Sequence, residues 1–142
     1  MVQYSLLDRR PEEEILGTAQ RVGLGVLVRG AVAGGLLAGK PPADYLGLGE
    51  AEVRGAAEAL RGVAEVRGAA NASRGVDPAR PMAQEAIRFV LGHPAVTTVV
   101  AGASNVAQVE TNAAAADLPP FRDRDLEALR ASVRRLQYTS HR

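Results

Sequence analysis

The chain has 142 residues, of which 46% are hydrophobic and 23% charged, the proportions of one ordinary globular domain. Its 17 basic and 16 acidic side chains leave a formal net charge of +1, which argues against nucleic acid as a partner, and the lack of cysteine excludes disulfides, thiolate metal sites and a cysteine nucleophile. No signal peptide or apolar stretch of about 18 residues is present, so we expect a cytoplasmic protein with no membrane association.

The first 28 residues have the pattern of a strand, a helix and a second strand. Residues 3–7 read as a short strand, and Pro11 followed by three glutamates predicts a helix start, because proline suits the first helical position and carboxylates complement the helix dipole. Gly23 is predicted to end this helix. Residues 24–28 form a continuous apolar run, which is typical of a parallel strand that is covered on both faces.

The middle of the chain is rich in glycine and alanine. Residues 30–40 predict a turn in which the glycines let the backbone approach something closely. Residues 34–40 have the glycine and lysine spacing of a P-loop, but Pro41 stands where that motif needs Ser or Thr for magnesium, so we reject a nucleoside triphosphatase. Residues 50–75 predict a weak helix, with Val53, Ala56, Leu60 and Val63 at helical spacing, and then a loose connection.

The remainder again alternates helices with a strand. A helix is predicted to start at Pro78 or Pro81 and to end near Gly92, and residues 96–101 form an apolar, β-branched strand. This alternation predicts an α/β protein with parallel strands. The predicted apolar stripes are Met82, Ala86, Phe89 and Val90 in the first of these helices, Val106, Val109, Ala113 and Ala116 in the next, and Leu126, Leu129, Val133 and Leu136 in the last.

The junction between the strand at 96–101 and the following helix has the features of an anion site. Asn105 is placed to cap the helix, and Gln108, three residues later, can reach back as in a capping box. The first N–H groups of such a helix point out of the carboxyl end of the preceding strand, where unpaired donors and the helix dipole both favour an anion. The alternative is an ordinary cap that binds no ligand.

Three stretches together resemble the C-terminal half of an aldo-keto reductase: YSLLDRRPEEEIL, GLGVLVRGAVAGGLLAGK and EAIRFVLGHPAVTTVVAGASNVAQVETNAAAADLP. The third is specific, because the glycine after the last strand, the helix-borne Gln108 and Asn112 four residues on occur in the family's order and spacing. The resemblance implies one domain, residues 1–142. It also implies an α/β fold that is a partial (β/α)8 TIM barrel, with about three C-terminal βα units, strands 6 to 8, and a final helix.

The same resemblance implies a cofactor, NADP, with NAD as the alternative because no Arg or Lys lies between Ala101 and Asn112 to pair with a 2′-phosphate. The turn at residues 29–36 would pass the nicotinamide and pyrophosphate, and the residues after Ala101 would hold the adenosine end. Gln3 is compared with the family's carboxamide-binding glutamine. The implied cofactor-binding residues are Arg29, Gly30, Ala31, Gly35, Leu36, Gly102, Ala103, Ser104, Gln108 and Asn112.

The family's catalytic Asp, Tyr, Lys and His lie on its first four βα units, so we assign no catalytic residue here; Tyr4, Asp8 and Lys40 match in type only. His93 and His141 have no partners at metal-ligand or catalytic spacing, so no metal site is expected. We expect the cofactor-binding half of an oxidoreductase that is inactive alone. The alternatives are a non-catalytic binding or oligomerisation module and a gene remnant.

A barrel takes about 250 residues, and a few strands cannot close one. Open sheet edges and uncovered apolar surface favour association. We therefore predict self-association, pairing with a complementing N-terminal half of the barrel, or only partial order.

Overall fold

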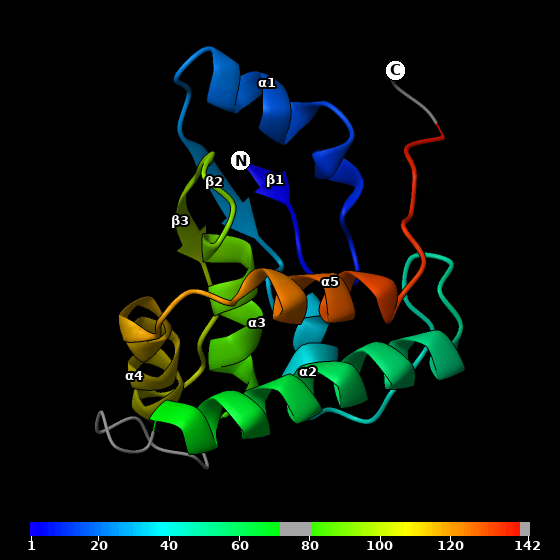
Figure 1. Ribbon diagram of the computed structural model, residues 1–142, viewed down its shortest axis with the longest axis vertical. Helices are drawn as coiled ribbons and strands as arrows, with labels where there is room; N and C mark the ends of the chain where they lie inside the picture. The colour runs from blue at the N-terminus through cyan, green and yellow to red at the C-terminus, as the bar shows by residue number, and fades with distance from the viewer. Residues whose placement is uncertain (72–80, 140–142) are drawn as a thin grey trace.

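The computed structural model describes residues 1–71 and 81–139. In these ranges β1 (Val2–Gln3), β2 (Val26–Arg29) and β3 (Val96–Val100) form a parallel sheet in the order β1-β2-β3, which confirms the predicted parallel α/β arrangement. Helix α1 lies at one end of the molecule and α2 at the other, with the sheet and α3 between them (Figure 1). The α-helices are α1 (Ile15–Arg21), α2 (Glu50–Asn71), α3 (Met82–Leu91), α4 (Val106–Ala114) and α5 (Asp123–Ala131).

Strand β1 is shorter than the predicted strand at residues 3–7. The amide of Tyr4 still donates to the carbonyl of Arg29, but Ser5 and Asp8 then exchange both of their backbone hydrogen bonds, and the Ser5 hydroxyl accepts a further bond from the Asp8 amide. This turn withdraws the backbone from the sheet. The apolar side chains that suggested a strand, Leu6 and Leu7 among them, are buried in the core all the same.

The chain between β1 and β2 follows the predicted pattern with one extra turn. A 3-10 turn, η1 (Arg10–Glu12), holds Pro11 in its first turn, and α1 begins only at Ile15. Gly23, at a φ of +69°, ends the helix as predicted. Its amide donates to the carbonyl of Gln20, and the amide of Leu24 donates to the carbonyl of Ala19. These two bonds form a Schellman motif, which needs a left-handed residue at that position.

Helix α2 is long and continuous as far as Asn71, which confirms the predicted helix; the rest of that segment, with the predicted loose connection, lies outside the described residues. Of the predicted stripe, Val53, Ala56 and Leu60 are fully buried and Val63 is partly buried. This stripe stabilises a helix that its glycines would weaken. Near its end, the buried Arg67 places its Nε 3.2 Å from Oε2 of the buried Glu85 on α3.

Arg67 also ties the last part of the chain to α2. Its two Nη atoms donate to the carbonyls of Pro119 and Pro120, and its guanidinium lies 4.0 Å from the centre of the Phe121 ring.

Helix α3 starts at Met82 with Pro81 as its N-cap; Pro78, the other predicted start, lies outside the described residues. Its predicted stripe is confirmed, with Ala86, Phe89 and Val90 buried and Met82 partly buried.

The sheet is covered on one face only in the described structure. Val26 and Val28 are buried, whereas Leu27 between them is 43% exposed, so the prediction that both faces are covered is wrong here. Strand β3 buries no side chain fully. The stripe predicted for α4 is also exposed, with Val106 at 73% and Val109 at 56%, because no described element packs on that side of the helix.

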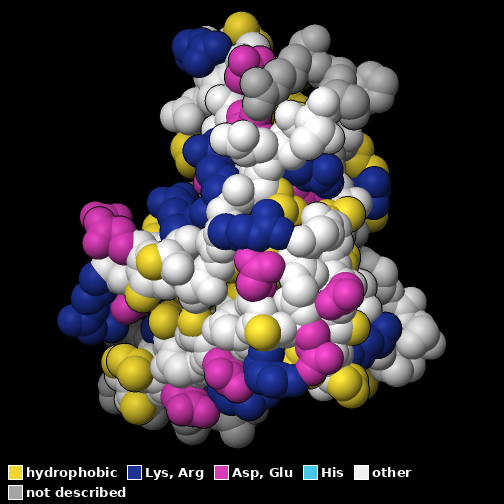
Figure 2. All heavy atoms as spheres, turned by 90° about the vertical axis from the view of Figure 1, so that its right-hand side faces the viewer, with side chains coloured by type: hydrophobic (Ala, Val, Ile, Leu, Met, Phe, Trp, Pro, Cys, Tyr) yellow, Lys and Arg dark blue, Asp and Glu magenta, His cyan; other side chains and the backbone are white. Residues whose placement is uncertain are grey.

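Helix α5 ends at Ala131, earlier than predicted, yet Val133 and Leu136 are buried in the extended segment that follows. The amide of Tyr138 donates to Glu13, which fixes this segment against the start of the chain. Figure 2 shows this face of the molecule, with a band of Lys and Arg side chains across its middle. None of the helices in the described ranges has the length and hydropathy needed to cross a membrane.

Candidate functional site

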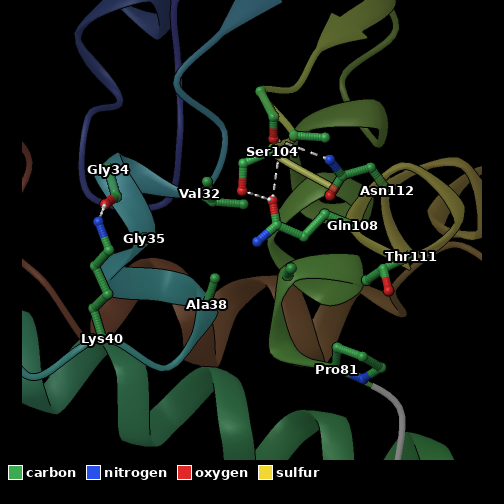
Figure 3. Close-up of a pocket in the computed structure, with 13 residues that line it drawn as sticks. Val32, Gly34, Gly35, Ala38, Lys40, Pro81, Ser104, Gln108, Thr111 and Asn112 are labelled. Carbon is green, nitrogen blue, oxygen red and sulfur yellow. Dashed lines mark hydrogen bonds between the residues drawn. The ribbon is translucent and has the colours of Figure 1, made fainter. Parts of the chain in front are cut away.

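A groove of about 790 Å³ lies at the carboxyl end of the sheet (Figure 3). One wall is the 3-10 segment η2 (Ala33–Ala38) with the residues beside it, and the other is the start of α4 with the turn after β3. The start of α3 completes the lining. The lining residues are Val32, Gly34, Gly35, Ala38, Lys40, Pro81, Ala83, Gly102, Ala103, Ser104, Gln108, Thr111 and Asn112.

The start of α4 is held by side chains of its own turn. The amide of Gln108 donates to Oδ1 of Asn105 over 2.9 Å, which is the predicted cap. The Gln108 side chain reaches back one residue further than a capping box does, because its Oε1 accepts from the amide and the hydroxyl of Ser104 over 2.8 and 3.1 Å. Nδ2 of Asn112 donates to the carbonyl of Gly102 over 3.2 Å. The turn is therefore fixed without a ligand.

Several polar atoms of this wall have no hydrogen-bond partner among the described residues. The amides of Val106 and Ala107, in the first turn of α4, have no acceptor among residues 1–71 and 81–139. The side-chain amide nitrogen of Gln108 points into the space between the two walls in Figure 3, and the Asn112 side chain lies beside that of Gln108. With Oε1 of Gln108 and Nδ2 of Asn112 already bonded, the side-chain donor of Gln108 and the side-chain acceptor of Asn112 stay available.

The opposite wall depends on two glycines. Gly34 and Gly35 have φ values of +67° and +102°, which kink η2, and the Lys40 side chain crosses over Gly35 to donate to the Gly34 carbonyl over 2.8 Å. A Cβ at Gly35 would lie 2.7 Å from Lys40 Cδ, so the absence of a side chain there makes room for the lysine.

The groove is electrostatically positive. Lys40 is the one charged side chain among its lining residues, and the exposed start of α4 adds the positive end of a helix dipole. An anion in this space would meet a primary ammonium group on one side and unpaired backbone amides on the other. In the described ranges, acidic and histidine side chains form no group of three or more that could hold a metal ion.

The structure brings together six of the ten predicted cofactor-binding residues. Leu36 instead lines a smaller neighbouring hollow that also includes Lys40, Ala31 is buried, and Arg29 and Gly30 lie at the end of β2 outside the groove lining. Sequence reasoning missed Lys40, although its spacing to the glycines was the signal that could have found it. The predicted residues that line the groove are Gly35, Gly102, Ala103, Ser104, Gln108 and Asn112.

Gln3 lies outside this groove, in a polar cluster at the end of β1. Its Nε2 donates to Oδ2 of the buried Asp8 and to the Tyr45 hydroxyl, each over 3.1 Å, and Asp8 also pairs with Arg10. The Gln3 side-chain carbonyl has no donor among the described residues.

Tyr4 and His93 are held in structural roles. Tyr4 is buried and donates to Glu12 over 2.8 Å, and burial together with that carboxylate raises its pKa. Burial lowers the pKa of His93, whose neutral Nδ1 accepts from the Ala95 amide. Neither side chain is placed for proton transfer at the groove.

Comparison with known proteins identifies relatives along almost the whole chain. The sequence model of the Aldo/keto reductase family matches residues 1–134. The chain is 32% identical over 151 aligned positions to the uncharacterized oxidoreductase YqkF of Bacillus subtilis (strain 168), covering 100% of this chain and 45% of the relative. It therefore spans less than half the length of this curated relative.

Solved structures of aldo-keto reductases have a fold similar to that of this chain. The holo form of the aldo-keto reductase AKR11C1 from Bacillus halodurans superposes with a TM-score of 0.77 at 32% identity, over 98% of this chain and 43% of that one. The thermostable aldo-keto reductase Tm1743, solved with the inhibitor epalrestat, matches with a TM-score of 0.60 over 92% of this chain and 38% of that one. At 18% identity this second likeness concerns the fold alone.

Proposed function

Because the chain belongs to the aldo/keto reductase family, we propose that it is the cofactor-binding half of an NAD(P)(H)-dependent carbonyl or alcohol oxidoreductase. Its three strands would correspond to strands 6 to 8 of the barrel, and the catalytic Asp, Tyr, Lys and His would come from βα units outside this chain. The start of α4 and Lys40 would hold a nicotinamide cofactor, which would supply a hydride to a carbonyl carbon or accept one from an alcohol. The observation that carries the proposal is the positive groove between Lys40 and the start of α4.

The two walls supply groups that suit different parts of a dinucleotide. The unpaired amides of Val106 and Ala107 and the ammonium group of Lys40 suit the phosphates, because each supplies donors without a competing carboxylate in the groove lining. The side-chain donor of Gln108 and the acceptor of Asn112 match the N7 acceptor and the N6 donor of adenine. These residues therefore fit the adenosine end and the adjacent phosphate.

The choice between NADP and NAD depends on the 2′-position. Residues 101–112 include no Arg or Lys, and both donors of Ser104 are already bonded to Gln108. Lys40 stands on the opposite wall, where it suits a phosphate near the glycines of η2. We propose binding of either dinucleotide, with modest discrimination between them.

Titration with NADPH, NADH and ADP-ribose, followed by nicotinamide fluorescence or calorimetry, tests this assignment. Gln108→Ala and Asn112→Ala should each weaken binding of all three ligands by roughly three- to thirtyfold, because each removes a hydrogen bond to the adenine or disturbs the α4 turn. Gln20→Ala, an exposed amide on α1, is the matched control and should leave binding unchanged. Saturable binding that survives both groove variants contradicts the placement of the site.

We also propose that the uncovered side of the sheet receives the remaining βα units of the barrel. Within the described ranges β1 and β3 each pair on one edge only, and Leu27 and Val100 are 43% and 48% exposed on the strands themselves. An apolar groove of about 390 Å³ runs along β1 and α1. Its apolar lining includes Met1, Val2, Ile15, Val22, Leu24 and Val26.

A second copy fits these edges less well. A two-fold dimer pairs identical edges, which sets parallel strands against each other in antiparallel fashion and leaves the other edge open. Head-to-tail pairing keeps the strands parallel but adds them three at a time, which does not give a (β/α)8 barrel. The part of the AKR11C1 chain outside the matched region is the probe: light scattering should detect a one-to-one complex, whereas a compact monomer or a closed two-fold dimer of this chain contradicts the proposal.

A further inference from the structure

A second hollow, of about 230 Å³, lies beside the groove, where η2 and the residues after it face α2 and the start of α3. The apolar part of its lining includes Leu36, Ala57 and Met82, which are partly buried and pack against the core. Lys40 lines both spaces, and its side chain extends to the Gly34 carbonyl in Figure 3. The hollow is smaller than pockets for drug-sized ligands, roughly 300–1,000 Å³, so it suits a small molecule.

Charged side chains from one side of α2 complete this lining. Arg54, Glu58 and Arg61 follow one another at helical spacing, so they share a face of the helix, and all three are exposed. Arg54 is paired with Glu50, one turn earlier. Among the described residues, the side chains of Arg61 and Glu58 have neither a hydrogen bond nor an ion pair. Arg61 therefore keeps all of its donors at the edge of the hollow.

The charged groups around the hollow are not balanced. Lys40, Arg54 and Arg61 are cationic. Glu58 is the one carboxylate among the described lining residues, and Glu50 offsets Arg54 from outside the lining. Lys40 donates to one carbonyl and keeps further N–H donors. A single negative charge would therefore balance the hollow, and its apolar lining would cover a hydrocarbon group attached to that charge.

We propose that this hollow binds a small organic monocarboxylate. The carboxylate lies between Arg61 and Lys40, because a guanidinium group presents paired donors that match its two oxygens. The hydrocarbon part covers Leu36 and Met82. A phosphate dianion fits less well, because it carries more charge than the hollow lacks and brings no apolar surface. Arg61 and Met82 lie outside the groove lining, so the proposal does not depend on the dinucleotide site.

Met82 supplies a reporter for this hollow alone. The chain has two methionines, and the other, Met1, lies in the apolar groove along β1 and α1. In NMR spectra of the chain with isotope-labelled methionine methyl groups, benzoate should shift the Met82 signal saturably, with a Kd on the order of 1 mM, and leave the Met1 signal in place. Met82→Leu assigns the two signals. The absence of a saturable shift at Met82 overturns the proposal.

Two further ligands, compared at constant ionic strength, separate charge from apolar contact. Benzamide keeps the ring of benzoate without its charge, and acetate keeps the charge without the ring. Each should bind at least about tenfold more weakly than benzoate. Benzamide binding as tightly as benzoate contradicts the role of the cations, and acetate binding as tightly as benzoate contradicts the role of the apolar lining.

Substitutions of exposed side chains locate the charge. Arg61→Gln should weaken benzoate binding about tenfold, because it removes the paired donors. Glu58→Gln removes the carboxylate of the lining and should strengthen binding about threefold, an effect of opposite sign that a general structural role would not produce. Arg21→Gln, an exposed arginine on α1, is the matched control and should leave the Kd unchanged. Unchanged affinity in Arg61→Gln, or an equal loss in Arg21→Gln, overturns the site.

Discussion

The two faces of the sheet differ more than any other regions of the molecule. On one face Val26 and Val28 pack against helices in a core that includes Leu16, Leu37 and Phe89, all nearly inaccessible to solvent. On the other face Leu27 and Val100 are 43% and 48% exposed. Neighbouring residues of one strand therefore have opposite environments. In the described residues, helices therefore cover one face of the sheet, and no element covers the other.

The largest effect should come from placing the same charge on each face of β2. Val28→Asp buries a carboxylate without a partner and should destabilise the chain by about 4 kcal/mol or more, enough to abolish cooperative unfolding. Leu27→Asp, one residue earlier on the exposed face, should change the free energy of unfolding by no more than about 1 kcal/mol. Urea denaturation followed by circular dichroism measures both. Equal losses would show that the exposed face is packed in solution.

A second test concerns the ion pair behind the covered face. Glu85→Ala removes the buried carboxylate that lies 3.2 Å from Nε of Arg67 and should cost about 3–5 kcal/mol in the free energy of unfolding. Glu85→Gln keeps an acceptor for Arg67 and should cost less. The same urea experiment ranks the two variants. If the alanine variant is no less stable than the glutamine variant, the pair contributes little to joining α2 and α3.

The cap of α4 should matter less, because this helix buries no side chain. Asn105→Ala removes the acceptor of the Gln108 amide and should cost about 1 kcal/mol. Asn105→Gly should cost only a few tenths, because glycine at this position leaves the backbone accessible to water. Hydrogen exchange of the α4 amides reports the loss locally. Unchanged protection in the alanine variant would mean that the Ser104 and Asn112 contacts alone fix the turn.

The smallest effect on stability is expected at the outer face of α4. Val106→Ser and Val109→Ser alter side chains that are already more than half exposed, so the free energy of unfolding should change by less than about 0.5 kcal/mol. Association should nevertheless decrease, because apolar surface is lost. Light scattering at several concentrations compares the double variant with the original chain. A loss of stability without a change in association would place this face in a contact within the chain.

Sequence reasoning succeeded where one local signal decided the structure. Gly23 as the end of α1, Asn105 as the cap of α4 and the alternation of strands and helices all follow from short-range rules. It failed where tertiary contacts decide. The exchange of bonds between Ser5 and Asp8 shortens β1, and the stripe predicted for α4 has no described neighbour to cover it.

The candidate site was predictable in part for the same reason. The residues after Ala101 are contiguous in sequence, so their pattern alone indicated a helix start with spare donors. Lys40 reaches the groove because η2 kinks at Gly34 and Gly35; its spacing to these glycines indicated a turn but not that the lysine side chain would cross back over it. The exposure of Val109 likewise could not be read from its spacing, since a helical stripe says nothing about whether a neighbour is present to cover it.

Lys40 is the only lysine in the sequence. Apart from the N-terminal amine, every reagent selective for primary amines therefore has a single target, and that target lies at the edge of the groove. A dye or crosslinker attached there would report directly on what enters the groove, without any engineered residue. The same side chain would let the isolated chain be fixed to a surface in one orientation, with the sheet edges left accessible.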